Sequence, residues 1–203
     1  MSAMPIYLVD DEEAIRRSLK LVLQLAGHEV VPFESGRHFL EAVDGLAPGC
    51  ILLDIRMPEI DGLQVQQAMV ERGIDMPLVI MTGHGDIAVA VTALKSGADD
   101  FVEKPFERAQ MLAAIERSCM RIGDPEGYRG FVTQARASLT RLTGTERAVL
   151  DAYAGGQASA AVAGMLGLPL DTIEMARISL IEKLGGGGLT DAIRISYLAK
   201  HGG

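Results

Sequence analysis

From residue 5 to about residue 120 the chain alternates between short apolar runs and longer amphipathic stretches. Five apolar runs have the length of strands, at residues 5–10, 29–33, 50–55, 77–82 and 100–104. Between them lie segments with the helical spacing of apolar residues, such as 12–27 and 85–97. Because parallel strands need a crossover between them, usually a helix, this alternation favours a parallel sheet covered on both faces. We expect an α/β fold with a five-stranded, doubly wound parallel sheet.

The pattern changes near residue 121. Gly and Pro cluster in residues 121–130 and the apolar periodicity lapses, which indicates a linker or hinge. Every later segment has helical periodicity, at residues 143–156, 159–167, 171–185 and 189–200, and the four glycines at 185–188 indicate a flexible connection. We predict a first domain at residues 1–121, a linker at 122–138 and a small all-α domain of four helices at 139–203.

The composition is that of a globular protein with an aliphatic core, since 48% of the 203 residues are apolar and only 4% are aromatic. The net charge of -8 argues against a general binder of polyanions or membrane surfaces. Residues 139–203 carry no net charge, so the preceding part holds the whole excess. Cys50 and Cys119 do not form a disulfide framework. No signal peptide or run of about 20 apolar residues stands out, so we expect a cytoplasmic protein with no membrane partner.

Four of the five predicted strands end in residues that can do chemistry. Asp10 and Asp11 follow the first strand, Asp54 ends the third, Thr82 the fourth and Lys104 the fifth. Open α/β sheets bind ligands at the carboxyl ends of their strands, so these groups would share one pocket. Three close carboxylates repel one another unless a cation lies among them, and oxygen donors suit Mg²⁺. Each residue alone has an ordinary alternative as a helix cap, a turn or a surface lysine; together they predict a divalent-metal site.

The segments "LVDDEEAIR", "LLDIRMPEIDGL" and "MTGHGDIAVAVTALKSGADDFVEKPF" resemble the receiver domain of two-component response regulators, in particular its FixJ-like branch. The resemblance covers nearly all of residues 4–120. It implies that Asp54 accepts a phosphoryl group from a histidine kinase. It also implies that Asp11 and Asp54, with Asp10 through water and the Arg56 carbonyl, hold Mg²⁺. Thr82 and Lys104 would then bind the phosphoryl oxygens, since a new anion attracts a hydroxyl and an ammonium.

The same resemblance implies a conformational switch. The loop after the fourth strand would close on the phosphoryl group and Phe101 would move into the vacated space, although plain core packing also explains this residue. Residues 85–97 and the strand that contains Phe101 would form the output face, where a phosphorylated homodimer forms. The four histidines, His28, His38, His84 and His201, lack ligand spacing and are assigned no metal.

Residues 139–203 resemble the LuxR-type helix-turn-helix of the FixJ and NarL group, through "LTGTERAVLDAYAGG", "VAGMLGL" and the apolar positions of "TIEMARISLIEKLG". The polar and basic positions of that family differ here. Ser159 and Ala160 replace its usual Asn-Lys pair, and Asp171, Ala176 and Ser179 occupy further positions that are usually basic. Only Arg177 and Lys183 remain as phosphate ligands, with Thr172 as a further DNA-contact candidate, and residues 171–184 carry one net negative charge. Since phosphate contacts supply most of the affinity for DNA, an ordinary promoter would be bound weakly.

The start of the recognition helix also differs from the family pattern. Asp171 followed by Glu174 resembles a capping box, and Pro169 disfavours an earlier helical start. We expect Asp171 to be the N-cap, with the helix beginning about two residues late. The change falls where such helices reach the bases.

Two hypotheses about function follow. The first is a phosphorylation-controlled transcription factor that binds an atypical promoter site. The alternative is a phospho-switched regulator whose helix-turn-helix domain binds a protein partner or only dimerises, without DNA. We do not expect an enzyme, because Asp54 belongs to the receiver pattern and no other catalytic constellation is recognisable. The family resemblance favours the first hypothesis and the local charge favours the second.

Overall fold

The computed structural model describes residues 4–83 and 87–202. The chain forms two compact units, and in the described residues the first comprises residues 4–83 and 92–124 and the second residues 87–91 and 125–202.

The first unit contains a parallel sheet with strand order β2-β1-β3-β4-β5. The strands are β1 (Ile6–Val9), β2 (Val30–Phe33), β3 (Cys50–Asp54), β4 (Leu78–Thr82) and β5 (Asp100–Glu103). They are almost entirely buried, which is why their sequences are continuous apolar runs rather than alternating ones. The expected five-stranded, doubly wound α/β fold is confirmed.

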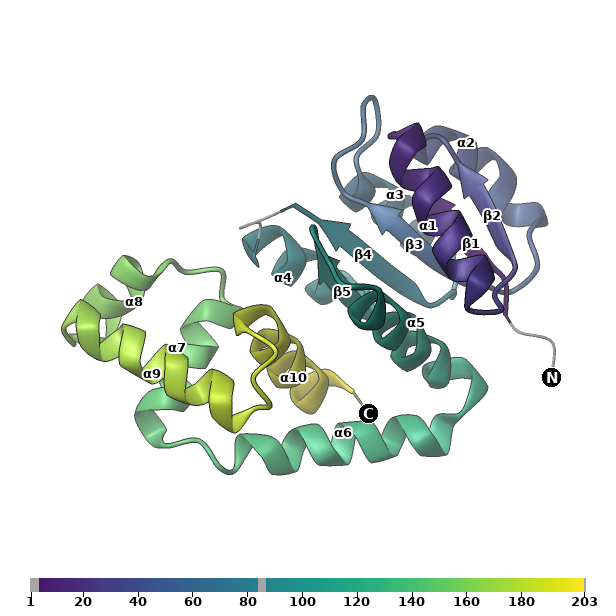
Figure 1. The fold of residues 1–203 in the computed structure, drawn as a ribbon. Coiled ribbons are helices and arrows are strands. Elements are labelled where there is room, and N and C mark those ends of the chain that lie inside the picture. Colours follow the sequence, from purple (N-terminus) through teal and green to yellow (C-terminus); the bar gives the residue numbers. More distant parts are fainter. Residues whose placement is uncertain (1–3, 84–86, 203) are drawn as a thin grey trace. The chain divides into compact units, whose positions relative to one another are not determined.

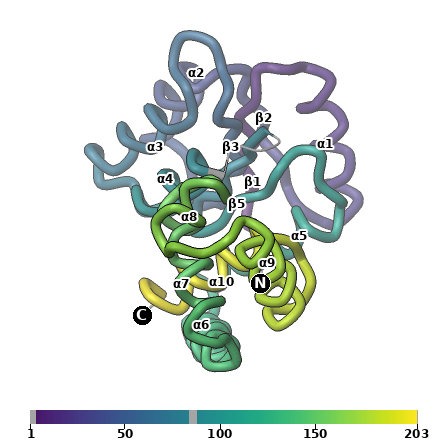
Figure 2. The backbone as a smooth tube through the Cα atoms, turned by 90° about the vertical axis from the view of Figure 1, so that its left-hand side faces the viewer, coloured from purple at the N-terminus to yellow at the C-terminus, as the bar shows by residue number. Residues whose placement is uncertain are grey.

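Helices cover both faces of this sheet. They are α1 (Glu13–Leu25), α2 (Gly36–Ala42), α3 (Gly62–Glu71), α4 (Ile87–Lys95) and α5 (Arg108–Gly123), with a short 3₁₀ helix at Val43–Gly45. α1 and α5 lie on one face and α2, α3 and α4 on the other (Figures 1 and 2). Among the residues that the structure describes, none of the helices has both the length and the apolar character of a membrane span.

The core beneath α1 and α5 is aliphatic, as the composition predicts. Leu19 and Leu23 of α1 and Met111 and Ile115 of α5 pack against the strands. Cys50 lies in this core, and both cysteines are free thiols. The sheet therefore forms a rigid base for the groups at its carboxyl edge.

The second unit is helical, with α6 (Pro125–Leu139), α7 (Gly144–Ala154), α8 (Ser159–Leu166), α9 (Leu170–Lys183) and α10 (Leu189–His201). Val149, Val162, Ile173 and Leu180 are fully buried in its core. Gly167 ends α8 with a φ of 64°, and the Leu168 amide donates to the Ala163 carbonyl. This turn joins α8 to α9 in a helix-turn-helix.

The segment expected as a linker, 122–138, is mostly helical. Pro125 stands at the first position of α6, where its missing N–H has no helical partner to lose. Val132, Ala135 and Leu139 have helical spacing and are buried, and Arg136 donates to the Ala199 carbonyl of α10. Two glycines in α6 hide this pattern in the sequence. The helical unit therefore has one helix more than the four expected, and the domain boundaries stay a prediction.

The expected N-cap of the recognition helix is wrong. α9 begins at Leu170, and Pro169 is its N-cap. The amides of Thr172 and Ile173 donate to the Pro169 carbonyl at 3.0 and 3.2 Å, so Asp171 already lies in the first turn. A carboxylate there is favoured by the partial positive charge of the helix N-terminus, without any capping bond.

Candidate functional site

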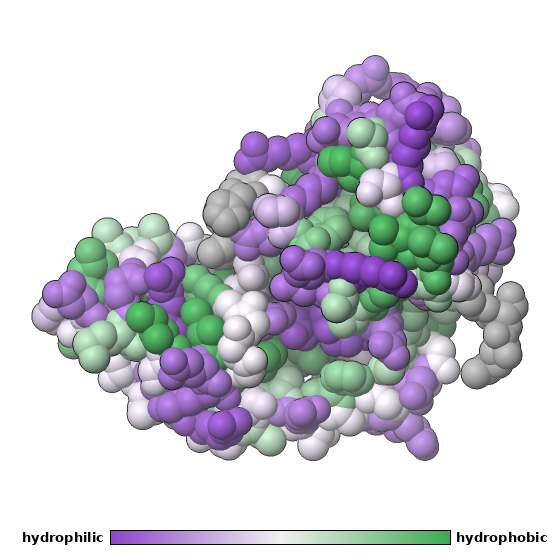
Figure 3. Space-filling model, in the orientation of Figure 1, coloured by the Kyte–Doolittle hydropathy of each residue, from purple (hydrophilic) through white to green (hydrophobic). Residues whose placement is uncertain are grey.

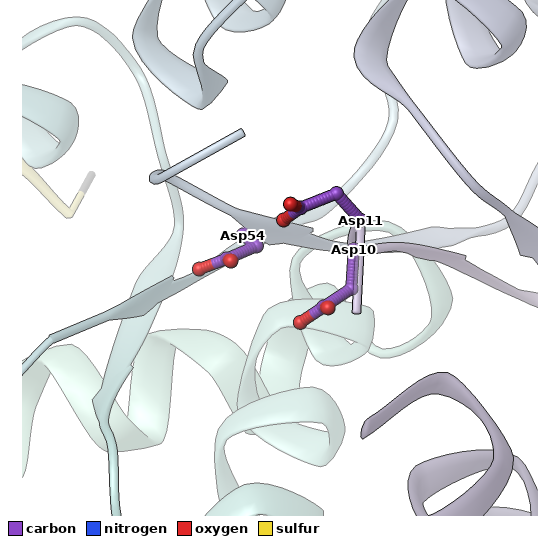
Figure 4. Close-up of side chains that lie close together, drawn as sticks. All are labelled: Asp10, Asp11 and Asp54. Carbon is purple, nitrogen blue, oxygen red and sulfur yellow. The ribbon is translucent and has the colours of Figure 1, made fainter. Parts of the chain in front are cut away.

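Three carboxylates meet at the carboxyl edge of the sheet. β1 and β3 are neighbours, with Val9 paired to Leu53, so Asp10 and Asp54 lie side by side where these strands end. Oxygen atoms of Asp10, Asp11 and Asp54 all lie within 4.8 Å of one another (Figure 4). Asp10 is fully buried and Asp54 is 5% exposed, whereas Asp11 is less enclosed.

Lys104 reaches into this cluster from the end of β5. Its Nζ lies 2.9 Å from Oδ2 of Asp10 and 3.1 Å from Oδ1 of Asp54. The Lys104 amide donates to the Thr82 carbonyl at 2.7 Å, which anchors the backbone beside β4. The structure thus brings Asp10, Asp11, Asp54 and Lys104 together, with Thr82 beside Lys104, and their shared role stays a prediction.

The ionisable groups of the site perturb one another. Burial raises the pKa of Asp54, and the charge of Lys104 only partly opposes this, so the pKa stays above its usual value. Burial also disfavours the charged form of Lys104, but bonds to Asp10 and the charge of Asp54 outweigh it and raise the pKa of Lys104. The site holds more negative than positive charge, which favours binding of a cation.

Local backbone contacts fix the acidic residues. The Glu12 amide donates to Oδ1 of Asp10 at 2.9 Å, and Arg16 donates to the Asp10 carbonyl at 2.7 Å. One carboxylate oxygen of Asp10 therefore accepts a hydrogen bond just before α1, close to the helix-cap role that its sequence position suggests. Its other oxygen accepts from Lys104. A Cβ at Gly62 would lie 2.4 Å from the Asp54 carbonyl oxygen, so only glycine lets α3 begin this close to Asp54.

The remaining predicted receiver residues lie around this cluster. Thr82 is 2% exposed and its hydroxyl donates to the Gly83 carbonyl at 3.4 Å. Phe101 is buried in β5, opposite Ile80 of β4. Arg56 follows two residues after Asp54, and its role as a carbonyl ligand stays a prediction. The loop expected to close, at residues 84–86 with His84, lies outside the described residues.

The donor set at this edge suits a hard divalent cation. Three carboxylates offer only oxygen, the group found among the described residues includes no thiol or imidazole, and their spacing lets one ion contact all three. Two of them are buried, so their mutual repulsion is poorly screened by water and one lysine balances only part of it. The residues present therefore fit Mg²⁺.

Two of the three predicted DNA-contact residues of the helical unit, Arg177 and Lys183, have protein partners. Arg177 forms an ion pair with Glu174 at 2.7 Å. Lys183 Nζ donates to both oxygens of Glu146, at 2.7 and 2.8 Å, and Ser179 donates to the same carboxylate at 2.6 Å. Thr172 is exposed. These contacts occupy both of the cations that sequence reasoning had left for phosphate.

Glu146 joins α7 to α9, a structural role that sequence reasoning missed. Thr143 and Glu146 form a capping box at the start of α7, a pattern the sequence does display. The bonds from Ser179 and Lys183 span 33 and 37 residues, so no local pattern indicates them. These bonds lower the pKa of Glu146 to about 2, against the opposing effect of burial.

The fold and the acidic site define the class of this protein. The family described as "Response regulator receiver domain" matches residues 6–116, and the chain belongs to this family of two-component response regulators. Its similarity to relatives extends through the helical unit as well.

Among curated proteins, it is similar to the transcriptional regulatory protein FixJ of Azorhizobium caulinodans, with 35% identity over 97% of this chain and 93% of the relative. FixJ of Bradyrhizobium diazoefficiens is 36% identical over 96% of this chain and 95% of its own. Among solved structures, full-length FixJ from B. japonicum matches with a TM-score of 0.59 and 33% identity over 98% of both chains. The chain is thus a response regulator of the FixJ type.

Proposed function

We propose that Asp54 is the phosphoacceptor of this regulator and that a histidine kinase is the donor. The observation that carries the assignment is the Lys104 ammonium placed between Asp10 and Asp54, 3.1 Å from Asp54 Oδ1. Phosphoryl transfer depends mostly on positioning and on neutralisation of charge. An Asp54 oxygen attacks phosphorus as the bond to the kinase histidine breaks, and Lys104 then neutralises oxygens of the phosphoaspartate.

Asp10, Asp11 and Asp54, with the Arg56 carbonyl, are the residues that would hold Mg²⁺. The bound ion supplies charge neutralisation for the incoming phosphoryl group. The Thr82 hydroxyl, at the end of β4, is the donor best placed to follow the new anion, because its present bond to the Gly83 carbonyl is long at 3.4 Å and weak. Such a rearrangement next to β5 is the route by which Phe101 would change its packing.

The output of the switch is control of transcription, through the helical unit. The similarity to FixJ regulators over nearly the whole chain supports this, as does the helix-turn-helix formed by α8 and α9. Promoter DNA is the expected partner of such a unit, with Thr172, Arg177 and Lys183 as the candidate contacts, and a phosphorylation-dependent homodimer is the expected active state. The ion pairs of Arg177 and Lys183 favour a protein partner as the second candidate.

The phosphoacceptor is tested with a small acyl-phosphate donor in the presence of Mg²⁺. Wild type should take up one phosphoryl group per chain, detected by intact-protein mass. Asp54→Asn should take up none, while the matched variant Asp44→Asn, which changes an exposed acid of the same unit, should be labelled like wild type. Labelling of Asp54→Asn at the wild-type level would refute the assignment.

A further inference from the structure

We propose that the exposed face of the recognition helix is a docking site for a basic amphipathic helix of a partner protein. This α8–α9 face consists of four apolar and three acidic residues, namely Met165, Leu170, Met175, Ile178, Asp171, Glu174 and Glu182. The inference rests on the proposed function only in that the helical unit is the output of the regulator.

The apolar part of this face is unusually exposed. In the part of the chain that the structure describes, nine large hydrophobic residues are exposed, and four of them belong to this face. Met175 is 72% exposed and Ile178 is 56% exposed. Their spacing of three residues places them on the same side of α9. Figure 3 shows hydrophobic side chains interleaved with hydrophilic ones over α8 and α9. Clustered exposed apolar residues mark an interaction site.

The face has no cations of its own to offer a nucleic acid. The chain has no Lys, Arg or His between Arg147 and Arg177, a stretch that holds all of α8, the turn and the first half of α9. In a helix-turn-helix the first helix crosses the DNA backbone and the start of the second reaches the bases. Asp171 would there face phosphates without a cation in this stretch to offset it, whereas the charge of Glu174 is balanced by Arg177.

The two cations that follow are already bonded within the unit. Arg177 is paired with Glu174 at 2.7 Å, on α9 itself. Lys183 is bonded to Glu146, whose side chain is 7% exposed, so its release to a phosphate would leave a buried carboxylate without its cation. The salt dependence of DNA binding grows with the number of neutralised phosphates, and this electrostatic attraction supplies essentially all non-specific affinity. A face that neutralises so few phosphates lacks this electrostatic contribution to DNA affinity.

Charge complementarity identifies the occupant. Apolar side chains at helical spacing, with carboxylates around them, fit a partner helix that has apolar anchors bordered by Lys and Arg. A second copy of this face would bring Asp171 and Glu182 close to acids of the same kind, in a chain that already has a net charge of -8 and in which Arg177 balances only Glu174. A DNA duplex is negatively charged, as the acids of this face are, so the two repel each other. A basic amphipathic helix satisfies both the apolar and the acidic residues.

The probe is a fluorescent synthetic helix of Leu and Lys, with Leu at positions i, i+3, i+4 and i+7, and its control has Glu in place of every Lys. Binding to the full-length protein is followed by anisotropy. We expect the Leu/Lys helix to bind at least tenfold more tightly than the Leu/Glu helix. Higher salt should weaken binding of the Leu/Lys helix, and Asp171→Asn should make this binding less dependent on salt.

Substitutions on the α8–α9 face test whether the peptide binds there. Met175→Ser with Ile178→Ser should weaken binding at least tenfold, and their exposure means that the fold should be kept, as checked by circular dichroism. Val70→Ser, which removes a 58% exposed apolar side chain from α3, is the matched control and should have no effect. Equal binding of the two peptides, or equal loss in the Val70 variant, would overturn the proposal.

The same proteins are tested with pooled random duplex DNA at low and physiological salt. We expect this face to contribute nothing to DNA binding, so any retention should be the same for wild type and for the Met175 and Ile178 variant, with or without phosphorylation. Retention that is lost in the Met175 and Ile178 variant would assign the face to DNA and overturn the inference. Phosphoryl uptake at Asp54 is scored on the same preparations, so a failure of the proposed function is seen separately.

Discussion

At the scale of single residues, Lys104 is bonded to two buried carboxylates at once, at 2.9 and 3.1 Å. Lys104→Met removes this cation and leaves Asp10 and Asp54 to repel each other. Removing one partner of a buried pair costs about 3 to 5 kcal/mol, and since the Lys104 side chain is 21% exposed we expect a smaller loss, about 2 kcal/mol. The free energy of unfolding in metal-free buffer, from urea denaturation, measures it.

The loss should shrink when Mg²⁺ is added, because a bound cation restores the missing positive charge. Lys95→Met, which changes an exposed lysine at the end of α4, is the control and should alter stability little. A loss of equal size with and without Mg²⁺ would mean that Lys104 acts through packing of its carbon chain rather than through its charge.

At the scale of elements, Glu146 joins the start of α7 to the end of α9. Its carboxylate accepts hydrogen bonds from the side chains of Ser179 and Lys183 and from the Thr143 amide. Glu146 is 6% exposed. Glu146→Gln removes the acceptor's charge from all four of its hydrogen bonds, and hydrogen bonds to charged groups are worth about 1.5 to 3 kcal/mol each. Because an amide still fits and Lys183 is partly solvated, we expect the helical unit to lose about 2 kcal/mol at pH 7.

The stabilisation that the ionised Glu146 carboxylate provides depends on pH. The pKa of Glu146 falls from 4.5 to about 2 in the folded protein, so the ionised carboxylate stabilises the fold above pH 4.5. This stability is lost as the pH falls from 4.5 towards 2. The difference in melting temperature between wild type and Glu146→Gln should therefore be constant above pH 5 and shrink below pH 4.5. Glu182→Gln, which removes an exposed acid of α9, is the control for the loss of one negative charge. A difference between wild type and Glu146→Gln that is the same at pH 3 and pH 7 would contradict the assigned bonds.

The elements also show how far sequence reasoning reaches. The five strands were predictable because buried parallel strands are continuous apolar runs, and Asp54 and Lys104 were predictable because strand ends meet at one edge. α6 was not predicted, since its buried stripe at Val132, Ala135 and Leu139 stands among glycines. The N-cap at Pro169 and the bonds of Glu146 to α9 depend on backbone geometry and on residues far apart in the chain.

At the scale of the whole molecule, phosphorylation should change the number of chains that associate. The chain of 21.6 kDa has a net charge of -8, and a phosphoryl group adds a further charge of about -1.5 to -2 at pH 7. Two copies therefore repel each other at long range, and a homodimer must form through apolar contact once the switch exposes its surface. Salt screens this repulsion, so moderate salt should favour the dimer.

Salt thus separates the two interactions of this protein, since it should strengthen the homodimer and weaken the docking of a basic helix. Light scattering on the phosphorylated protein should give a mass about twice that of one chain, with the dimer fraction rising between low and physiological salt. Asp54→Asn, treated in the same way, should keep the mass of a single chain because it cannot be phosphorylated. A phosphorylated protein that keeps the mass of one chain at every salt concentration would show that the signal reaches the helical unit within a single chain.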